Sequence, residues 1–503
     1  MTSPIKSPSG VKTKAYSYEN FQGLDTSRDI TSLDTGKQQH LSKMSNCTSD
    51  WRGQIVRDAS AKFRKGDFVT QHIRFFANDE TVWAEKTGSG LTLRSDRDHV
   101  LADAHPASAI VASTVFNQSV QFTARFRPMY RYNGINFERN QSPAINSMLP
   151  AYCASVQRRL AVAGIPGRET QIHFSRVDQD EIFPDDEEAT STNVLRAGFI
   201  DIANLIGSAD QITGLGSFEQ NRLVAFTADR AIIFKIDPDI DRWLTDDNAN
   251  INIGCASHNT IVNAGTDLLF CSRSGIHSIK RSEENGILVY SYSMSDKVDI
   301  LYRELFRSVP NPEDISAVFD QDTAQYHVFF PQDGDFLCKR LTLAMNPEGG
   351  EAQPKFSTGD FLNSRCGDFL NGKMVLGTSG GVFEVLKVED VIEDAVTPEL
   401  DITTPLLWHG SLEATKETNS MILQAAGVGK LIVDAQDDKG RQIGSMVIEV
   451  NDTSDDNYFQ DVPLSVQYER KWQHRYRAAQ YRFRTEGGSG LLRIIGFAIT
   501  VRT

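Results

Sequence analysis

The densest group of ionisable side chains in this 503-residue chain is an acidic run in the segment RVDQDEIFPDDEEATST. It contains the carboxylates of Asp178, Asp180, Glu181, Asp185, Asp186, Glu187 and Glu188. Paired carboxylates can cleave glycosidic bonds as acid and base, and clustered carboxylates can hold a divalent cation or repel phosphates. Because these residues are nearly contiguous and flank Pro184, we expect a solvated acidic loop and treat Asp185, Asp186, Glu187 and Glu188 as candidates for a gate.

A basic stretch precedes the acidic run. Residues 125 to 176 contain eight arginines, opposed only by Glu138 and Glu169. Arg125 and Arg127 are two positions apart in a predicted strand, so their side chains share one face. Arginines in this setting suit a solvated sheet edge, a subunit contact or contact with phosphates. We therefore treat Arg125, Arg127 and Arg131 as candidates for contact with another subunit or with DNA.

A second basic stretch, YERKWQHRYRAAQYRFR, runs from Tyr468 to Arg484 and is also aromatic. Arginine and aromatic residues are enriched at the centres of protein interfaces, so a protein partner fits this stretch as well as nucleic acid does. The candidates for a partner interface are Arg470, Trp472, Arg475 and Tyr476.

Motifs of enzymes are missing from the sequence. It contains no GxxxxGK[ST] phosphate loop, no GxSxG nucleophile elbow and no HExxH metal pair. The six cysteines lie far apart, outside CxxC pairs, which favours reduced, buried thiols over a zinc site or a redox motif, with a disulfide as the alternative. We expect no catalytic residue, no metal and no cofactor.

The elements that would position these residues repeat along the chain. A turn, an alternating apolar strand and a charged end recur as GSGLTLRSD at Gly88, TADRAIIFKID at Thr227, RSGIHSIKR at Arg273 and SGGVFEVLK at Ser379. The terminal turns, marked by Gly90, Gly134, Val177, Arg230, Gly275, Gly334 and Gly381, lie 43 to 59 residues apart. A four-stranded propeller blade has about 40 to 50 residues. This spacing predicts an all-β chain with a β-propeller of six or seven blades, whose closure borrows a strand from one end.

Differences in composition and in the spacing of predicted strands divide the sequence into three regions. Residues 1–50 read as an extended, basic amino-terminal arm, residues 51–393 as the propeller, and residues 394–503 as a smaller antiparallel β platform. We expect the arm to pair with the carboxy-terminal region and complete the platform. The clearest helix candidate is SDKVDILYRELF, from Ser295 to Phe306.

Composition limits the class of protein. A formal net charge of -14 argues against a protein that coats nucleic acid through bulk positive charge. No apolar run reaches the roughly 18–20 residues that span a bilayer, and the first residues lack the apolar centre of a secretory signal. We expect a soluble protein made in a cytoplasm.

Four phrases carry a resemblance to a family. FQGLDTSRD, AVAGIPGRETQIHFSRVDQDEIF, DQITGLGSFEQNRLVAFTADRAIIFKID and IGCASHNTIVNAGTDLLFCSRSGIHSIKR resemble the tail nozzle, or DNA-stabilisation hub, proteins of short-tailed bacteriophages. The resemblance spans about Phe21 to Arg281 and, more loosely, the carboxy-terminal region.

The resemblance implies a structural virion protein rather than an enzyme. Six copies would form a nozzle below the portal and adaptor rings, retain the packaged double-stranded DNA and conduct it during ejection. Its partners would be other copies, the adaptor protein, tail fibres or a tip protein, DNA in transit and, indirectly, the host envelope, with no small-molecule substrate. Two alternatives remain, a monomeric propeller scaffold and a propeller that binds or cleaves glycans.

Overall fold

The computed structural model describes residues 13–29, 39–50, 52–66, 68–77, 79–87, 90–101, 105–106, 111–186, 193–206, 210–245, 251–265, 267–281, 288–290, 293–332, 337–345, 353–387, 394–410, 413–451, 466–487 and 492–502. The chain divides into two compact units. Unit 1 comprises Met1–Lys62, Thr342–Phe361 and Leu386–Thr503, and unit 2 comprises Phe63–Leu341 and Leu362–Val385.

Unit 2 contains six four-stranded sheets in the part of the chain that is described. Five of them are antiparallel and consist of four strands that follow one another in the chain. These strands are β8 (Val69–Ala77), β9 (Glu80–Thr87), β10 (Gly90–Ser95) and β11 (His105–Pro106); β12 (Val111–Phe116), β13 (Ser119–Ala124), β14 (Tyr130–Tyr132) and β15 (Phe137–Arg139); β16 (Tyr152–Val156), β17 (Arg159–Ala163), β18 (Gln171–Phe174) and β19 (Gly198–Asp201); β20 (Ile212–Phe218), β21 (Arg222–Thr227), β22 (Ala231–Lys235) and β23 (Leu244–Thr245); and β24 (Val262–Ala264), β25 (Asp267–Cys271), β26 (Ile276–Arg281) and β27 (Leu288–Tyr290).

The sixth four-stranded sheet joins two distant parts of the chain. It orders β32 (Cys366–Leu370), β33 (Lys373–Thr378) and β34 (Gly381–Val385) beside β7 (Ala61–Gly66), which comes from before the first blade. Gly381 has φ +118, and a Cβ on it would lie 2.3 Å from the Cα of Gly66, so these two backbones approach closely because glycine is present. A borrowed strand therefore closes the last blade.

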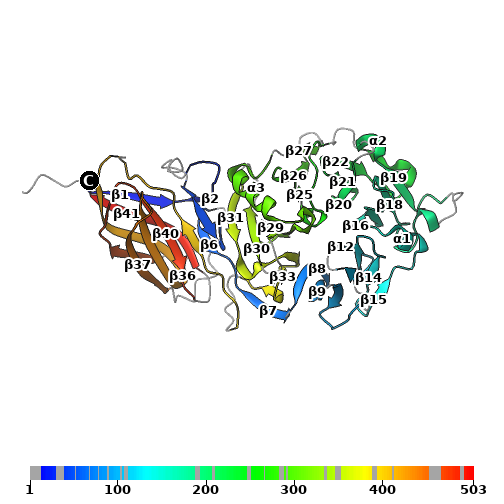
Figure 1. Cartoon of the computed structure of the whole chain (residues 1–503), viewed down its shortest axis with the longest axis horizontal. Helices are drawn as coiled ribbons and strands as arrows, with labels where there is room; N and C mark the ends of the chain where they lie inside the picture. The colour runs from blue at the N-terminus through cyan, green and yellow to red at the C-terminus, as the bar shows by residue number, and fades with distance from the viewer. Residues whose placement is uncertain are drawn as a thin grey trace, which may run out of the picture. The chain divides into compact units, whose positions relative to one another are not determined.

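A further group, β28 (Ser316–Asp320), β29 (Gln325–Pro331) and β30 (Cys338–Ala344), lies between the fifth and the last of these sheets in the chain. Around unit 2, each first strand contacts the first strand of the next sheet, in the order β8, β12, β16, β20, β24, β28, β32 and again β8. This closed ring of small sheets is a β-propeller, and Figure 1 shows its sheets grouped around a common centre. The predicted all-β propeller of six or seven blades is confirmed.

Local sequence explains the tight hairpins of the blades. The turns between the first and second strands place both central residues at positive φ at Asn117–Gln118, Gln157–Arg158 and Asn371–Gly372. Turns of this type match the twist of the strands and favour Asn and Gly. The blades pack through alternating apolar residues, including Val120 and Phe122 of β13 against Val82 and Leu91 of the preceding blade.

Unit 1 is a second β structure made from both ends of the chain. Its strands are β1 (Thr13–Glu19), β2 (Phe21–Leu24), β3 (Gln39–Leu41), β4 (Lys43–Ser45), β5 (Cys47–Ser49), β6 (Ile55–Arg57), β31 (Lys355–Gly359), β35 (Asp401–Thr403), β36 (Lys416–Asp437), β37 (Gln442–Asn451), β38 (Val466–Lys471), β39 (Arg475–Tyr476), β40 (Ala479–Thr485) and β41 (Leu492–Arg502).

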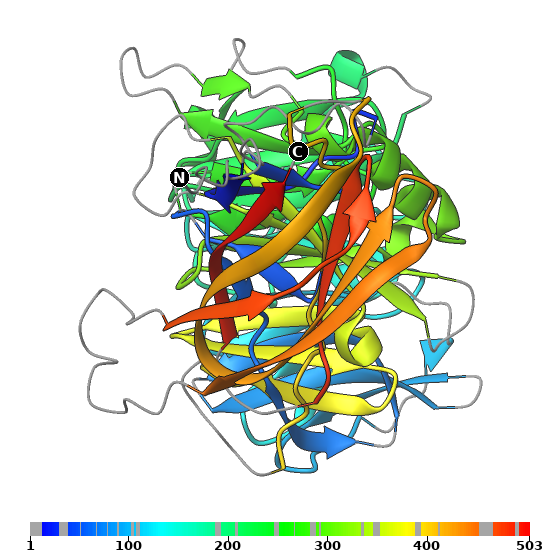
Figure 2. The same ribbon diagram turned by 90° about the vertical axis from the view of Figure 1, so that its left-hand side faces the viewer.

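The 22-residue strand β36 organises unit 1. Its first half pairs with β41 and β38, and its second half pairs with β37 and β40. Figure 2 shows it as a long curved strand beside β41. The amino-terminal strand β1 pairs antiparallel with β41 over its whole length, from Thr13 opposite Arg502 to Glu19 opposite Gly496. The arm thus supplies a strand to the carboxy-terminal sheet.

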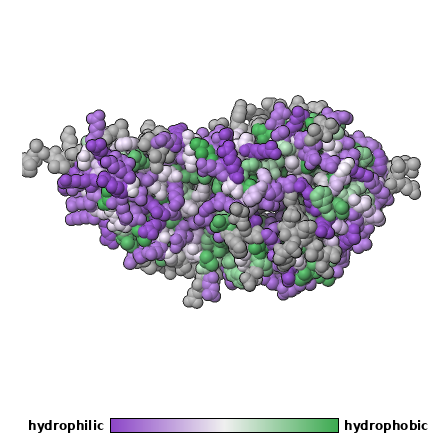
Figure 3. All heavy atoms as spheres, in the orientation of Figure 1, coloured by the Kyte–Doolittle hydropathy of each residue, from purple (hydrophilic) through white to green (hydrophobic). Residues whose placement is uncertain are grey.

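The described residues form few helices, and these are short. They are α1 (Pro143–Met148), α2 (Ala203–Ile206) and α3 (Asp299–Ser308), with 3-10 turns η1 (Pro184–Asp186), η2 (Ile240–Arg242), η4 (His258–Thr260), η5 (Asp296–Val298), η6 (Pro312–Asp314) and η7 (Phe361–Asn363). The helix predicted at Ser295–Phe306 corresponds to η5 and α3. No helix of the described chain has the length and apolarity to cross a membrane. Hydrophilic residues cover much of the surface drawn in Figure 3.

The recurring phrase corresponds to the same strand position in each blade where it occurs. Its four examples contain the third strands β10, β22, β26 and β34. The residues before β22, β26 and β34 form turns, and Gly88 and Ser89, before β10, lie outside the described residues. The markers Gly134 and Val177 follow third strands instead of preceding them, and Gly334 lies outside the described residues. The units also divide at other residues than 50 and 393, since residues 51–62 and 342–361 belong to unit 1.

Candidate functional site

Arg125 lies at the propeller end where first strands begin. It follows β13, and its guanidinium donates two hydrogen bonds of 2.9 Å to the Glu313 carboxylate and one of 2.9 Å to the Tyr152 hydroxyl. Glu313 precedes β28 and Tyr152 begins β16. Burial, with a further contribution from the charge of Glu313, raises the pKa of Tyr152 to about 12. This bidentate ion pair links blades that are far apart in sequence.

Other contacts at the same end also join the beginnings of first strands. The Ser257 hydroxyl lies 2.7 Å from the carbonyl oxygen of Ile315, and Asn259 donates to the carbonyl oxygen of Val111. Burial raises the pKa of Asp314, opposed by the positive charge of Arg365. The turn Arg125–Arg127, the start of β12 and the segment before β28 therefore share one end of the propeller.

Polar side chains from separate blades also contact each other. His72 forms a 2.7 Å hydrogen bond with Ser113, and Arg74 lies 3.4 Å from the Asp368 carboxylate. Burial, and then the charges of Arg74 and His258, lower the pKa of His72 to about 3. Burial also raises the pKa of Asp368. Neutral imidazoles and a paired carboxylate are consistent with a structural role, and no three metal-ligating side chains converge among the described residues.

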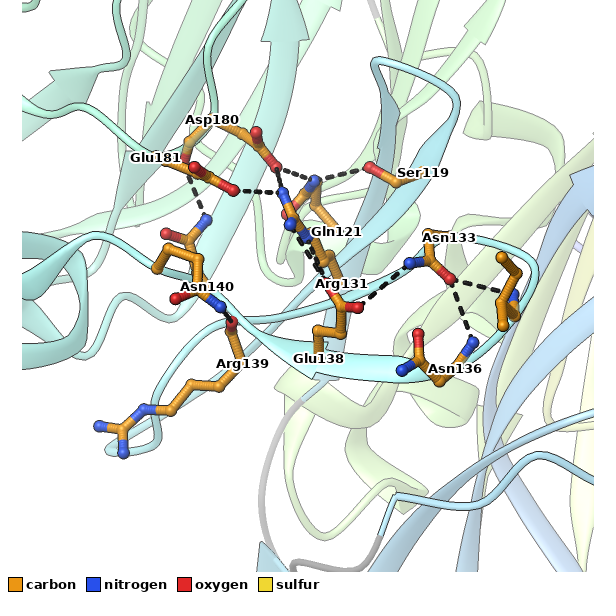
Figure 4. Close-up of polar contacts among 12 residues, drawn as sticks. Ser119, Gln121, Arg131, Asn133, Asn136, Glu138, Arg139, Asn140, Asp180 and Glu181 are labelled. Atoms are coloured by element: carbon orange, nitrogen blue, oxygen red, sulfur yellow. Dashed lines mark hydrogen bonds and ion pairs between the residues drawn. The ribbon is translucent and has the colours of Figure 1, made fainter.

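Arg131 is held by carboxylates and is not presented to a ligand. On β14 it contacts Glu138 at 3.1 Å, Asp180 at 3.5 Å and Glu181 at 2.7 Å, as Figure 4 shows. Gln121, directly across the strand pair, donates to Asp180 at 2.6 Å. The sequence prediction grouped Arg131 with Arg125 and Arg127, but three carboxylates already neutralise it, and it anchors the acidic segment to the second blade.

The acidic candidates have different surroundings. Asp186 accepts hydrogen bonds from the backbone amides of Ala144 at 2.9 Å and Phe183 at 3.0 Å, and from the Ser142 hydroxyl. It therefore fixes the start of α1. Asp185 forms a half-exposed ion pair with Arg168 at 3.0 Å. Glu187 and Glu188 lie outside the described residues.

The aromatic and basic stretch alternates between core and surface. Trp472 and Tyr476 retain 8% and 4% of their accessible surface, so these two predicted interface residues belong to the core of unit 1. The Trp472 ring packs edge-on against His474 at 4.7 Å, and the Tyr476 hydroxyl lies 2.8 Å from Nδ1 of His409. Arg470 and Arg475 are exposed and keep their place as interface candidates.

Arg230 and Arg273, which lie in equivalent turns, were noted from the sequence as part of the repeats and not as functional candidates. Arg230 precedes β22 and Arg273 precedes β26, and both are exposed. The signal was present, because both arginines belong to the recurring phrases TADRAIIFKID and RSGIHSIKR. All six cysteines are buried thiols outside disulfides, as predicted.

The sequence and the structure were compared with known proteins, and similarities were found only among solved structures. No family model and no curated protein matches the sequence. Similar solved structures include virginiamycin B lyase from Staphylococcus aureus, at 10% identity and a TM-score of 0.38, covering 66% of this chain and 98% of that one. YCF48 from Cyanidioschyzon merolae has 11% identity and a TM-score of 0.33, covering 65% of this chain and 98% of that one. The extracellular domain of BT3049 from B. thetaiotaomicron has 10% identity and a TM-score of 0.39, covering 87% of this chain and 62% of that one. At such identities, a shared reaction or partner does not follow.

Proposed function

We propose that this chain is the subunit of a tail nozzle in a short-tailed bacteriophage. Six copies would extend the portal and adaptor channel, retain packaged double-stranded DNA and conduct it during ejection. The observation that carries the proposal is the distribution of the family-like phrases over both units. FQGLD lies on β2 of unit 1, and the other three phrases cover β17–β18, β20–β22 and β24–β26 of the propeller.

The physical properties of the chain support this role. A net charge of -14 suits a conduit wall, because attraction summed over many phosphates would slow a sliding duplex. Closed blades leave few long free strand edges, which suits a rigid wall. Partly exposed arginines form ion pairs within the propeller, such as Arg125 with Glu313 and Arg131 with Asp180. No catalytic group is needed for such a role.

Assembly with the adaptor protein tests the proposal. The purified full-length chain, alone and mixed with the adaptor protein of the same phage, is imaged by electron microscopy. We expect particles with six-fold symmetry in the mixture. Virions produced without the chain should lose their packaged DNA, measured as nuclease-sensitive DNA after filling.

Two results would replace the proposal with an alternative. A chain that stays monomeric at all concentrations and ignores the adaptor would be a propeller scaffold. Release of sugars from host polysaccharide by the purified chain would make it a glycan-cleaving propeller.

A further inference from the structure

Four consecutive blades carry an arginine in the turn between their second and third strands. Arg127 lies between β13 and β14, Arg168 between β17 and β18, Arg230 between β21 and β22, and Arg273 between β25 and β26. Arg230 and Arg273 are exposed, and Arg127 is half-buried beside Phe126, whose side chain is 64% exposed. A repeated basic position is unexpected in a chain with a net charge of -14.

These turns lie on one face of the propeller. In an up-and-down blade, the turn between the second and third strands lies at the end where the first strand begins. Contacts agree with this geometry. Arg125, next to Arg127, bonds to Tyr152 at the start of β16, and Arg230 donates at 2.8 Å to the carbonyl oxygen of Leu205, in the segment that leads into β20.

Three arginines in turns of the opposite face form ion pairs with carboxylates. Most arginines in the turns between second and third strands do not. Arg97, Arg158 and Arg242 lie in turns of the opposite face and pair with Glu80, Asp178 and Asp239. In the turns between second and third strands, Arg168 pairs with Asp185. Arg127, Arg230 and Arg273 form no ion pair within 4.0 Å with any carboxylate of the described residues. Among the residues that the structure describes, three guanidinium groups on one face thus have no carboxylate within 4.0 Å.

We infer that this face of the propeller binds the phosphate backbone of double-stranded DNA through Arg127, Arg230 and Arg273. The three arginines belong to the second, fourth and fifth blades, so they suit an extended polyanion better than a single phosphate. Arginine donates to phosphate oxygens without reading base sequence, as a conduit requires. The choice of DNA among polyanions rests on the proposed function. The acidic remainder of the chain would limit contact to this face.

Salt dependence of DNA binding tests the inference. Binding of the full-length chain to a short duplex of random sequence is measured by fluorescence anisotropy over a range of low salt concentrations. Removing three phosphate contacts in R127Q/R230Q/R273Q should reduce the slope of log affinity against log salt by about 3. The matched control is R97Q/R158Q/R242Q, which removes the same charge from the opposite face. This control should keep the wild-type slope.

Several outcomes would overturn the inference. They are equal slopes for both triple variants, or no DNA binding by the wild-type chain at low salt. A turn variant that loses adaptor binding but keeps its DNA slope would assign the face to a protein partner instead. Electron microscopy of the same samples separates the two proposals. Absence of six-fold particles would remove the nozzle, while a reduced slope in the turn variant would still support a DNA-binding face.

Discussion

The Tyr16 hydroxyl donates a 2.7 Å hydrogen bond to the backbone carbonyl of His409, 393 positions further along the chain. Tyr16 lies on β1, opposite Ile499 of β41, and its ring packs 5.0 Å from the His409 imidazole. A Cβ on Gly410 would lie 2.7 Å from the Tyr16 hydroxyl oxygen. The amino-terminal arm is therefore fixed by a specific polar contact as well as by strand pairing.

Removing this hydroxyl should loosen the arm. We expect Tyr16→Phe to lower the free energy of unfolding by about 1 kcal/mol, because a partly buried carbonyl loses its donor. Urea unfolding of the full-length chain measures the change. Ser17→Ala is the control, since it removes a hydroxyl from an exposed neighbouring residue of the same strand and should have little effect. Equal losses in the two variants would contradict this role of Tyr16.

Asp185 and Asp186 should respond differently to the same substitution. Asp186→Ala leaves two backbone amides and a hydroxyl without their acceptor, which should cost about 1–3 kcal/mol. Asp185→Ala removes a half-exposed ion pair with Arg168, which is worth about 0–1 kcal/mol. Thermal unfolding of the two variants side by side checks the difference. A larger loss for Asp185→Ala would be incompatible with the α1 contacts.

The turn Asn117–Gln118 should accept glycine with a gain in stability. Gln118 is exposed and has φ +56, a conformation that glycine adopts without steric cost. We expect Gln118→Gly to raise the free energy of unfolding by about 0.5–1 kcal/mol. The energy gained by removing a side chain from the left-handed conformation should exceed the entropic cost of ordering a more flexible glycine. In the control Gln179→Gly, at an exposed residue with ordinary φ, the sign should be opposite. Chemical denaturation of the two variants decides the matter.

Acid should destabilise unit 1 through its buried histidines. Burial, and then the charges of Lys416 and His474, lower the pKa of His409 to about 3, and burial lowers the pKa of His474 to about 4. An unfolded histidine has a pKa of about 6.5, so between about pH 6.5 and 4 the unfolded chain binds more protons than the folded one. The free energy of unfolding should therefore fall as the pH falls through this range.

The variant His474→Gln should show a flatter pH dependence over the same range. Each histidine that stays neutral contributes up to about 1.4 kcal/mol per pH unit to the slope, so the loss of one imidazole is measurable. Trp472 fluorescence reports on the site, because its ring lies 4.7 Å from that of His474. Parallel stability curves for variant and wild type would show that other groups govern the acid transition.

Much of the propeller could be predicted from local patterns. A turn, an alternating strand and a charged end are properties of one strand and its turn, and every blade needs them, so β10, β22, β26 and β34 are visible as repeats. The place of β31 was not predictable in this way. β31 lies beside β30, which precedes it in the chain, but its other neighbour in the sheet is β4, where Ser45 lies opposite Thr358, more than 300 positions away.

The candidate site residues likewise include features that local sequence predicts and features that depend on distant residues. In KWQHRYR, strand alternation puts Trp472 and Tyr476 on one face and Arg475 on the other, and the structure buries the two aromatic residues. Composition led us to predict all three as interface residues. The different states of Arg127 and Arg131 could not be predicted, because the carboxylates of Asp180 and Glu181 reach Arg131 from another blade. Local sequence predicts which face of a strand a side chain lies on. It does not predict which charged residues from a distant loop will contact that side chain.

The division of unit 1 between the two ends of the chain imposes an order on its synthesis. A ribosome makes β1 long before its partner β41, which comprises residues Leu492–Arg502. The propeller, between them, can close once β34 is available to β7. Since domains generally fold as units while they emerge, the blades can be complete before β1 finds its partner. Until β41 emerges, β1 lacks this partner, and the exposed Lys14, Ser17 and Glu19 suit a strand that stays unpaired during that time.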